Sequence, residues 1–304
     1  MASHFAFEAI GTSWKIDISE TLDPAREKAL LNDIRVRIAE FDKAYSRFRD
    51  DSLVSHMAKK SGNYSLPDDA VSMLSLYKEL YDLSGGRVTP LVGQVLSDAG
   101  YDATYSLKPK SQIPPAKRWE DVLSFKAKGH GGHPSLALKE PALLDFGALG
   151  KGYLIDIVAD IIRGRGIETY TVDAGGDIAY SAGSKPEAKP LRVGLEDPQD
   201  PKKVVGLAHI GGIGYARQSV CGSAGNRRVW DRFHHIIDPI AVESPRHILG
   251  LWTVADTTLL ADAMATALFF IEPEKLLSYR FEYAIVFADR SAVVSKGFPG
   301  KFFG

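Results

Sequence analysis

Residues 142–153 read Ala142-Leu143-Leu144-Asp145-Phe146-Gly147-Ala148-Leu149-Gly150-Lys151-Gly152-Tyr153, and the rest of the chain is organised around them. The apolar residues 142–146 predict a β-strand that runs into a glycine-rich turn. A helix is expected from about Gly150 to Gly164, where apolar side chains recur at helical spacing: Ile155, Ala159 and Ile162. This stretch therefore predicts a strand, a turn and a helix in direct succession.

Lys151 at the start of this helix suggests contact with an anion. The first turn of a helix has unpaired N–H groups, and a cation at that end is understandable if a phosphate docks there. A solvated lysine after a tight turn explains the residues equally well. Only two residues separate Gly147 from Gly150-Lys151, so the stretch is neither a Walker A loop nor the dinucleotide fingerprint Gly-x-Gly-x-x-Gly.

Composition narrows the class of protein. The 304 residues suffice for a large hydrophobic core, and a net charge of -1 gives no electrostatic reason to expect a nucleic acid or an anionic membrane as a partner. Cys221 is the only cysteine, which excludes an internal disulfide. No stretch approaches the ~18 apolar residues of a membrane span. Without a visible signal peptide or lipoprotein cysteine the expected location is cytoplasmic, although a chain trimmed of its leader would look the same.

Strand patterns outnumber helix patterns along the chain. Residues 5–19 alternate as a strand, with a kink or bulge at Ile10-Gly11-Thr12, and Asp23-Pro24 predicts the start of a helix that continues to Tyr45. Further strands are expected at 122–125, 169–173, 178–180, 191–195, 204–210, 213–220, 251–254, 283–288 and 292–295. Further helices are expected at 67–83, shortly before Ser97, at 259–271 and at 273–279. Because the order is not a regular βαβ alternation, the sequence predicts a mixed α+β layered fold.

Asp262 and Thr266 stand four residues apart on one face of an otherwise apolar helix. A buried carboxylate is costly unless it is paired or bound to a metal, and a carboxylate with a hydroxyl suits Mg²⁺. Alternatively, Thr266 bonds to its own i−4 carbonyl while Asp262 pairs with a lysine or caps a loop. Both interpretations stay open.

Two further polar residues stand near the ends of predicted strands. His235 lies in His235-Ile236-Ile237-Asp238-Pro239, and histidine is the commonest general base near neutral pH, yet most single histidines are structural. Asp177 follows Gly175-Gly176 in a turn, where it serves either a ligand or the turn itself. Neither residue decides a function on its own.

Taken together, these features have a specific order. The combination consists of Gly11-Thr12, Ser46-x-Phe48 with Asp51-Ser52, Gly85-Gly86, Leu144-Asp145-x-Gly147-Ala148-Leu149-Gly150-Lys151-Gly152, Asp173-Ala174-Gly175-Gly176-Asp177, His235-Ile236-Ile237-Asp238-Pro239 and Ala261-Asp262-Ala263-x-Ala265-Thr266-Ala267. In this order the chain resembles the FAD:protein FMN transferase (ApbE-like flavin transferase) family over roughly residues 8–290. The resemblance implies a single domain over residues 1–304, one compact unit with two lobes, in which residues 102–135 are a loop-rich insertion.

The resemblance also implies roles for individual residues. FAD contacts are implied for Ile10, Phe48, Arg87, Val88, Thr89, Asp145, Lys151, Asp177, His235 and Ile236. Mg²⁺ ligands are implied for the Ala148 carbonyl, Asp262, Thr266 and the backbone of Ala265. Catalytic roles are implied for Lys151, Asp262 and His235, with His235 as the base. The implied reaction is the Mg²⁺-dependent transfer of FMN from FAD to a Thr or Ser hydroxyl of a partner protein, with release of AMP.

Other functions remain compatible with these residues. An FAD pyrophosphatase that releases FMN and AMP would use the same metal and phosphate residues. A flavin-binding protein without turnover would keep Phe48 and the loop glycines but tolerate the loss of Asp262, His235 or Lys151. The chain also departs from the family pattern at Ile10, where methionine is usual, at Phe48, where tyrosine is frequent, and at 87–90 and 240–242. These departures concern FAD orientation and acceptor docking more than the metal centre.

Overall fold

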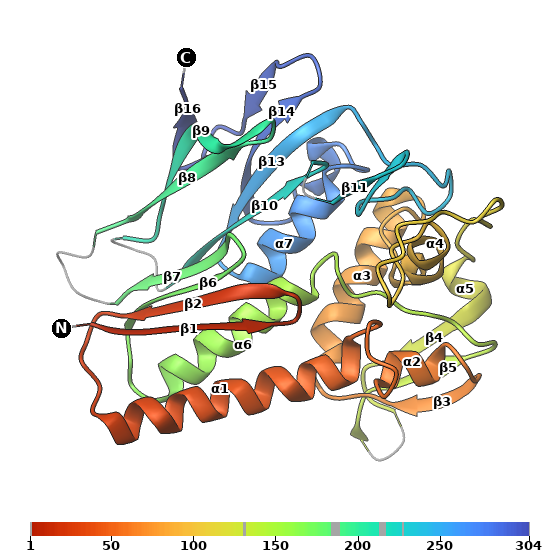
Figure 1. Cartoon of the computed structure of the whole chain (residues 1–304), viewed down its shortest axis with the longest axis horizontal. Helices are drawn as coiled ribbons and strands as arrows, with labels where there is room; N and C mark the ends of the chain where they lie inside the picture. The colour runs from red at the N-terminus through yellow and green to blue at the C-terminus, as the bar shows by residue number, and fades with distance from the viewer. Residues whose placement is uncertain (1, 130–131, 184–188, 213–216, 227, 304) are drawn as a thin grey trace.

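An antiparallel sheet of eight strands runs through the centre of the computed structural model, which describes residues 2–129, 132–183, 189–212, 217–226 and 228–303 (Figure 1). In spatial order its strands are β1 (Ser3–Ala9), β2 (Thr12–Ile18), β6 (Thr169–Ala174), β7 (Asp177–Ala182), β10 (Gln218–Ala224), β13 (Ile248–Ala255), β14 (Phe281–Phe287) and β15 (Ala292–Val294). Along β2, Trp14, Ile16 and Ile18 are buried while Lys15 and Asp17 are exposed, as the alternation predicts.

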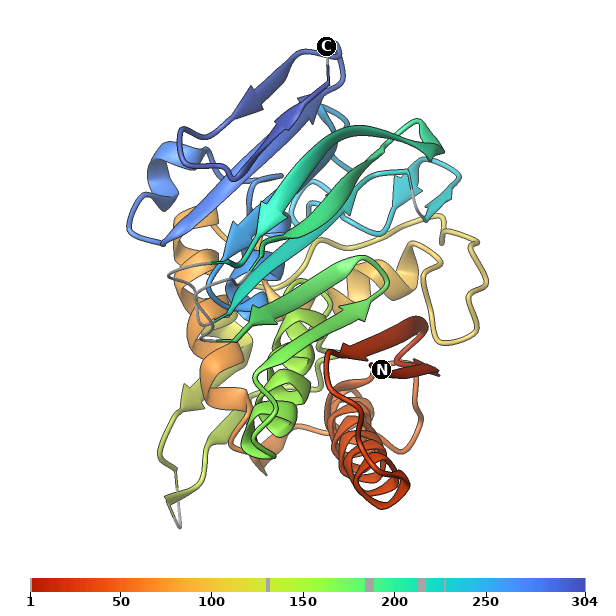
Figure 2. The same ribbon diagram turned by 90° about the vertical axis from the view of Figure 1, so that its left-hand side faces the viewer.

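Three smaller sheets surround the large one. They are formed by β3 (Gly62–Ser65), β5 (Ser135–Leu138) and β4 (Leu123–Lys126); by β16 (Gly300–Phe302), β9 (Asp200–Ile210) and β8 (Leu191–Asp197); and by β11 (Val229–Trp230) and β12 (Phe233–His234). Figure 2 shows β8 and β9 lying over the upper strands of the large sheet. Buried side chains of β8 and β9 meet Val220, Trp252 and Val254 there in a separate apolar cluster.

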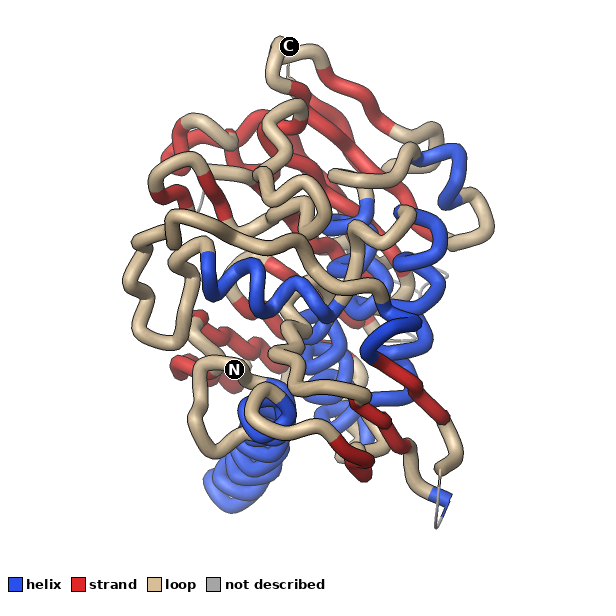
Figure 3. The backbone as a smooth tube through the Cα atoms, turned by 90° about the vertical axis from the view of Figure 1, so that its right-hand side faces the viewer, coloured by secondary structure: helices blue, strands red, loops and turns tan. Residues whose placement is uncertain are grey.

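The helices are α1 (Pro24–Tyr45), α2 (Leu53–Met57), α3 (Ala70–Ser84), α4 (Gly93–Asp98), α5 (Trp119–Val122), α6 (Gly150–Gly164) and α7 (Thr258–Ala267), with 3₁₀ turns η1 (Pro90–Val92) and η3 (Pro273–Leu276). The largest apolar cluster joins the large sheet to α1, α3, α6 and α7. Figure 3 shows helices in the middle of the molecule, with long loops running across them. The mixed α+β layered fold is therefore confirmed.

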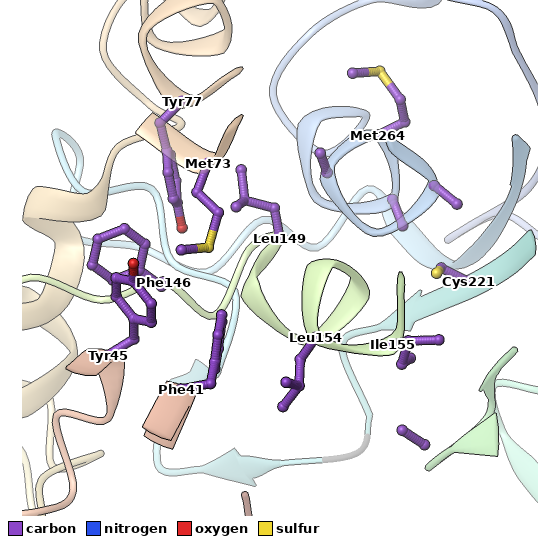
Figure 4. Packing of buried hydrophobic residues seen from close by; sticks show 14 of the residues in the cluster. Phe41, Tyr45, Met73, Tyr77, Phe146, Leu149, Leu154, Ile155, Cys221 and Met264 are labelled. Atoms are coloured by element: carbon purple, nitrogen blue, oxygen red, sulfur yellow. The ribbon is translucent and has the colours of Figure 1, made fainter. Parts of the chain in front are cut away.

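The strand expected at 142–146 is wrong. These residues have no regular secondary structure, although Leu144 and Phe146 are buried. Phe146 packs against Tyr45 and Tyr77, with ring centroids 5.0 and 5.9 Å apart, as Figure 4 shows. The apolar pattern therefore indicated side chains that anchor a loop in the core, and periodicity alone does not separate that case from a buried strand.

The kink expected at Ile10-Gly11-Thr12 is a hairpin turn. Ile10 and Gly11 both have positive φ, 46° and 72°, and the register pairs Ala9 with Thr12. Two positive φ values match the twist of the flanking strands, and glycine adopts them readily while isoleucine rarely does. Residues 5–19 therefore form two strands, β1 and β2.

Other boundaries follow the sequence more closely. Asp23 caps α1, accepting hydrogen bonds from the amides of Ala25 and Arg26 at 3.0 and 2.9 Å. The helix expected at 259–271 ends at Ala267, and the one at 273–279 is the short turn η3. Of the strand expected at 213–220, residues 213–216 lie outside the described residues, and β10 begins at Gln218. No helix within the described ranges has the length and apolarity to cross a bilayer.

Two carboxylates join α6 to α7. Asp156 of α6 accepts hydrogen bonds from the amides of Thr258 and Leu259, at 2.9 and 2.8 Å, and so caps the start of α7. Asp262 of α7 accepts one from the amide of Gly152 in the first turn of α6, at 2.8 Å. Each helix therefore satisfies first-turn N–H groups of the other, which have no partner within their own helix.

Gly152 permits this close packing. A Cβ atom at Gly152 would lie 2.3 Å from the Thr258 carbonyl oxygen and 2.6 Å from the Asp262 Cβ. We therefore expect Gly152→Ala to lower the free energy of unfolding by about 2 kcal/mol in urea denaturation, because overpacking forces the two helices apart.

Gly164→Ala is the matched control, since a Cβ at this last residue of α6 meets no atom within 4 Å. It should leave stability unchanged or raise it by about 0.5 kcal/mol, as alanine loses less backbone entropy in a helix than glycine does. Equal losses in the two variants would contradict the role assigned to Gly152.

Candidate active site

Lys151 in the first turn of α6 forms an ion pair with Asp177 at the start of β7. Asp177 is buried, and its Oδ1 accepts a hydrogen bond from the amide of Gly222 at 3.1 Å. Burial opposes the charge on Lys151, but Asp177 and Asp262 nearby outweigh it and raise the pKa of the lysine. Lys151 is thus a fixed positive charge, and Asp177 does more than shape its turn.

Asp262 is the least compensated charge of this group. Its side chain is buried, and its Oδ2 accepts the Gly152 amide hydrogen bond described above. Burial, followed by the nearby charge of Asp177, raises the pKa of the Asp262 carboxyl to about 7, against the lowering effect of Lys151. Strongly raised pKa values of this kind are typical of functional sites.

The implied metal ligands lie on α7 and in the turn that leads into α6. Asp262 and Thr266 are one turn apart on α7, Ala265 lies between them, and Ala148 is in the turn that leads into α6. Asp262 accepts a hydrogen bond from the first turn of α6, whereas the alternative to a metal site expected it to pair with a lysine or to cap a loop. No hydrogen bond from the Thr266 hydroxyl to the Asp262 carbonyl occurs among the described residues. The donor set of one carboxylate, one hydroxyl and backbone carbonyls contains only hard oxygens, which fits Mg²⁺.

That donor set differs from a cluster of acidic or histidine ligands. Within the described ranges, no three His, Cys, Asp or Glu side chains are grouped so as to hold a metal. The binding of Mg²⁺ by Asp262, Thr266 and the two alanine carbonyls therefore stays a prediction.

Asp145 is held by a residue that the sequence analysis passed over. The Nε of Arg47 donates to Asp145 Oδ2 at 2.5 Å, and the amide of Gly147 donates to Oδ1 at 2.7 Å. The Asp145 backbone is fixed as well, because the Tyr77 hydroxyl donates to its carbonyl at 3.1 Å. The FAD contact expected of Asp145 would therefore be made by a carboxylate already paired with a guanidinium.

The other residues expected around FAD differ in their exposure. Val88 and Thr89 are buried, and the Thr89 hydroxyl accepts a hydrogen bond from the Leu91 amide at 3.2 Å. Arg87 is partly exposed and its Nε donates to Asp238 at 2.9 Å. Ile10 is half-buried at the β1–β2 turn. The structure therefore assigns Thr89 and Arg87 structural partners, and their contacts with FAD stay predictions.

His235 and Ile236 follow β12 directly. Ile236 is buried and His235 half-buried. The adjacent His234 is structural: its Nε2 lies 2.9 Å from the Pro245 carbonyl, and burial lowers its pKa. The role of His235 as the base stays a prediction, whereas His234, the last residue of β12, is held by the Pro245 carbonyl.

A cavity outside this group of residues lies away from these charges. It measures about 1140 Å³ and is bounded by the loop after β12, the segment that follows α7, and β14. Of the residues expected in the site, only Arg87 lines it. We take the cluster of Lys151, Asp177 and Asp262 as the candidate active site, because two buried carboxylates there share one lysine.

The sequence analysis missed three residues that shape this site. Arg47 stands at the unspecified position of Ser46-x-Phe48, Asp156 lies inside a helix pattern, and Tyr105 belongs to the loop-rich region. Each acts through a partner far along the chain: Asp145, the start of α7 and Phe48, respectively. Arg47 and Asp156 matter because they are buried, but a sequence pattern shows them only as polar residues and does not reveal their burial.

Comparisons with known proteins concern the whole chain. The model of the ApbE family matches residues 10–284. The FAD:protein FMN transferase of Klebsiella pneumoniae (strain 342) is 27% identical over 278 residues, covering 88% of this chain and 78% of the relative. The protein of the same name from Escherichia coli (strain K12) is 25% identical over 284 residues, with the same coverage of 88% and 78%.

Solved structures share the fold. The flavin transferase ApbE from Vibrio cholerae has a TM-score of 0.79 at 20% identity, and 98% of each chain is covered. The ApbE protein of Thermotoga maritima has a TM-score of 0.80 at 21% identity, with 97% of each chain covered. At these identities the likeness concerns the fold of the whole chain.

The raised pKa of Asp262 predicts a pH effect on stability. In EDTA, the unfolding temperature of the wild type should fall more steeply between about pH 4 and about pH 7 than that of Asp262→Asn. The pKa of the folded carboxyl is about 7, whereas the ordinary pKa of an aspartate is 3.8. The stabilising contribution of the bound proton is therefore complete below about pH 4 and is lost progressively as the pH rises to about 7, by up to about 1.4 kcal/mol per pH unit.

Asparagine keeps an oxygen that accepts the Gly152 hydrogen bond, so the comparison isolates the titration. Parallel pH profiles of the two proteins would show that Asp262 titrates at its ordinary pKa.

Proposed function

The chain belongs to the ApbE family, and on that premise we propose that it is an FAD:protein FMN transferase. FAD is the substrate, and the acceptor is a Thr or Ser hydroxyl of a partner protein. The products are the FMN-modified protein and AMP. The observation that carries this proposal is that the buried Asp262 lies beside the start of α6, which bears Lys151. A carboxylate next to a positively charged helix start suits a divalent cation together with a diphosphate.

Lys151 and the start of α6 handle the phosphates. The first-turn amides of a helix favour an anion, and the charge on Lys151 adds a fixed positive group at the same place. Mg²⁺ would be held by Asp262, Thr266 and the carbonyls of Ala148 and Ala265. When bound, it polarises the phosphoryl oxygens and neutralises charge that develops on them.

The transfer itself is an in-line displacement at phosphorus. The acceptor hydroxyl oxygen forms a bond to the FMN phosphorus, and the bond from that phosphorus to the bridging oxygen breaks, which releases AMP. His235 takes the proton of the attacking hydroxyl as the general base. Lys151 stabilises the negative charge on the phosphates through the transition state.

The flavin or adenine ring requires an apolar slot near these phosphates. Ile10, Phe48, Val88 and Ile236 supply apolar side chains, and Asp145 and Arg87 supply polar contacts. We keep the cytoplasmic location as a prediction from the sequence alone. A single domain over residues 1–304, with 102–135 as an insertion, is likewise part of this proposal.

Purified protein incubated with FAD and Mg²⁺ tests the reaction directly. In the presence of a threonine-bearing acceptor protein, the flavin should become covalently attached and AMP should appear in equal amount. Free FMN formed at the same rate without any acceptor would instead identify an FAD pyrophosphatase, and FAD binding without products a flavin-binding protein.

We expect Asp262→Asn to abolish Mg²⁺-dependent formation of AMP. The loss should exceed about 100-fold, because the variant removes the only carboxylate among the implied metal ligands. Asp160→Asn is the matched control, since Asp160 is an exposed carboxylate on α6, and it should retain full activity. Wild-type rates in Asp262→Asn would eliminate the metal site.

His235→Ala should keep the affinity for FAD and slow the transfer by about 10²- to 10⁴-fold, the range typical of a lost general base. FAD binding is measured by calorimetry and transfer by fluorescence of the modified acceptor. His4→Ala replaces an exposed histidine on β1 and serves as the control. If His235→Ala lost FAD binding but kept its rate at saturating FAD, the histidine would be a binding residue.

A further inference from the structure

Tyr105 occupies one face of Phe48. The two rings are stacked, with centroids 5.1 Å apart and planes inclined by 9°, although Tyr105 is 48% exposed. The Tyr105 hydroxyl lies 4.0 Å from the position of a Cβ at Gly11. The tyrosine ring therefore stands between Phe48 and the Ile10–Gly11 turn, in the space that we define as the ring slot.

Arg47 borders the same slot with a hydrogen-bond donor that has no partner. Its side chain is 2% exposed, its Nε donates to Asp145, and its Nη1 donates to the Tyr101 carbonyl at 2.6 Å. The remaining nitrogen, Nη2, is buried and bonds to no group among the described residues. A buried donor without an acceptor is costly, so Nη2 indicates an acceptor that arrives with a ligand.

The position of Arg47 over Phe48 restricts the chemical class of that ligand. The guanidinium carbon lies 4.2 Å from the centroid of the Phe48 ring, and Asp145 already balances the positive charge. With its charge paired, Arg47 offers Nη2 as a hydrogen-bond donor, which suits a ring nitrogen or carbonyl of a flat ligand stacked on Phe48. An adjoining cavity of about 490 Å³, lined in part by Arg47, Phe48 and Ala103, leaves room for a larger ring system.

The loop that carries Tyr105 is held mainly by its own contacts. Asp102 accepts hydrogen bonds from the amides of Thr104 and Ser106, at 2.8 and 3.1 Å. Tyr105 and Leu107 have φ of 52° and 53°, in the left-handed region that such side chains rarely adopt. A strained, self-contained loop can be displaced as a unit without unfolding the core beneath it.

On the basis of the FAD substrate proposed above, we propose that Arg47 positions FAD by recognising one of its rings. The ring displaces Tyr105 from Phe48, stacks in its place, and accepts a hydrogen bond from Arg47 Nη2 at a ring nitrogen or carbonyl. Tyr105 is the resident occupant of the slot in the free protein. Both isoalloxazine and adenine have such an acceptor edge, so this chemistry is common to the two halves of FAD.

Tyr105→Ala tests the displacement. The wild-type tyrosine must leave Phe48 before the ligand ring can stack, so its removal should tighten FAD binding by about threefold to tenfold in calorimetry. Tyr105→Phe keeps the ring, and Leu107→Ala changes the same loop without touching the slot, so both controls should bind FAD as the wild type does. An unchanged or weaker affinity in Tyr105→Ala would overturn the proposal.

Arg47→Lys tests the recognition. Lysine keeps a positive charge for Asp145 but loses the donor at Nη2 and the Nη1 hydrogen bond to the Tyr101 carbonyl, so FAD should bind about tenfold more weakly and the folded variant should unfold at a lower temperature than the wild type. The same loss should appear in the Tyr105→Ala background. A folded Arg47→Lys protein with unchanged affinity would overturn the assignment, and if this variant did not fold, Tyr105→Ala alone would decide.

FMN and ADP identify the ring, because each carries one ring of FAD. If Tyr105→Ala tightens FMN only, the slot takes isoalloxazine, and if it tightens ADP only, the slot takes adenine. Either result supports the proposal, and an effect on neither ligand overturns it. Failure of the wild type to bind FAD at all would contradict the proposed function instead, so the two failures are distinguishable.

Discussion

The site depends on an exchange of carboxylates between two helices. Asp156 of α6 caps the start of α7, and Asp262 of α7 accepts an amide hydrogen bond from the start of α6. The exchange requires close approach at Gly152, where a side chain would collide with the Thr258 carbonyl. Since Lys151 and Asp262 belong to these two helices, the same contacts that stabilise the fold also set the spacing of the charged groups.

The site has more buried negative charges than positive ones. Asp177 and Asp262 are both buried, and Lys151 pairs directly with only one of them. The second carboxylate obtains an amide hydrogen bond and a raised pKa rather than a counter-ion. Such an arrangement favours a proton or a hard cation at Asp262, because an isolated ionised carboxylate is costly in the interior.

The sequence predicted the fold where local chemistry decides it. The cap at Asp23, the alternation of β2 and the helix from Gly150 to Gly164 follow from residues adjacent in the chain. The strand prediction for residues 142–146 failed because a loop anchored by Phe146 among distant aromatic side chains has the same apolar pattern as a strand. The order of motifs brought Lys151, Asp177 and Asp262 into one proposal. It could not reveal Arg47 or Tyr105, whose partners are set by tertiary packing.

The ion pair between Lys151 and Asp177 makes the ligands of this site interdependent. An anion that draws the lysine towards itself removes the counter-charge of a carboxylate that is only 2% exposed, beside a second buried acid. A cation arriving at the same time offsets that loss. The dinucleotide and the metal proposed for this site would then be thermodynamically linked, each increasing the affinity of the other by the same factor, whichever arrives first.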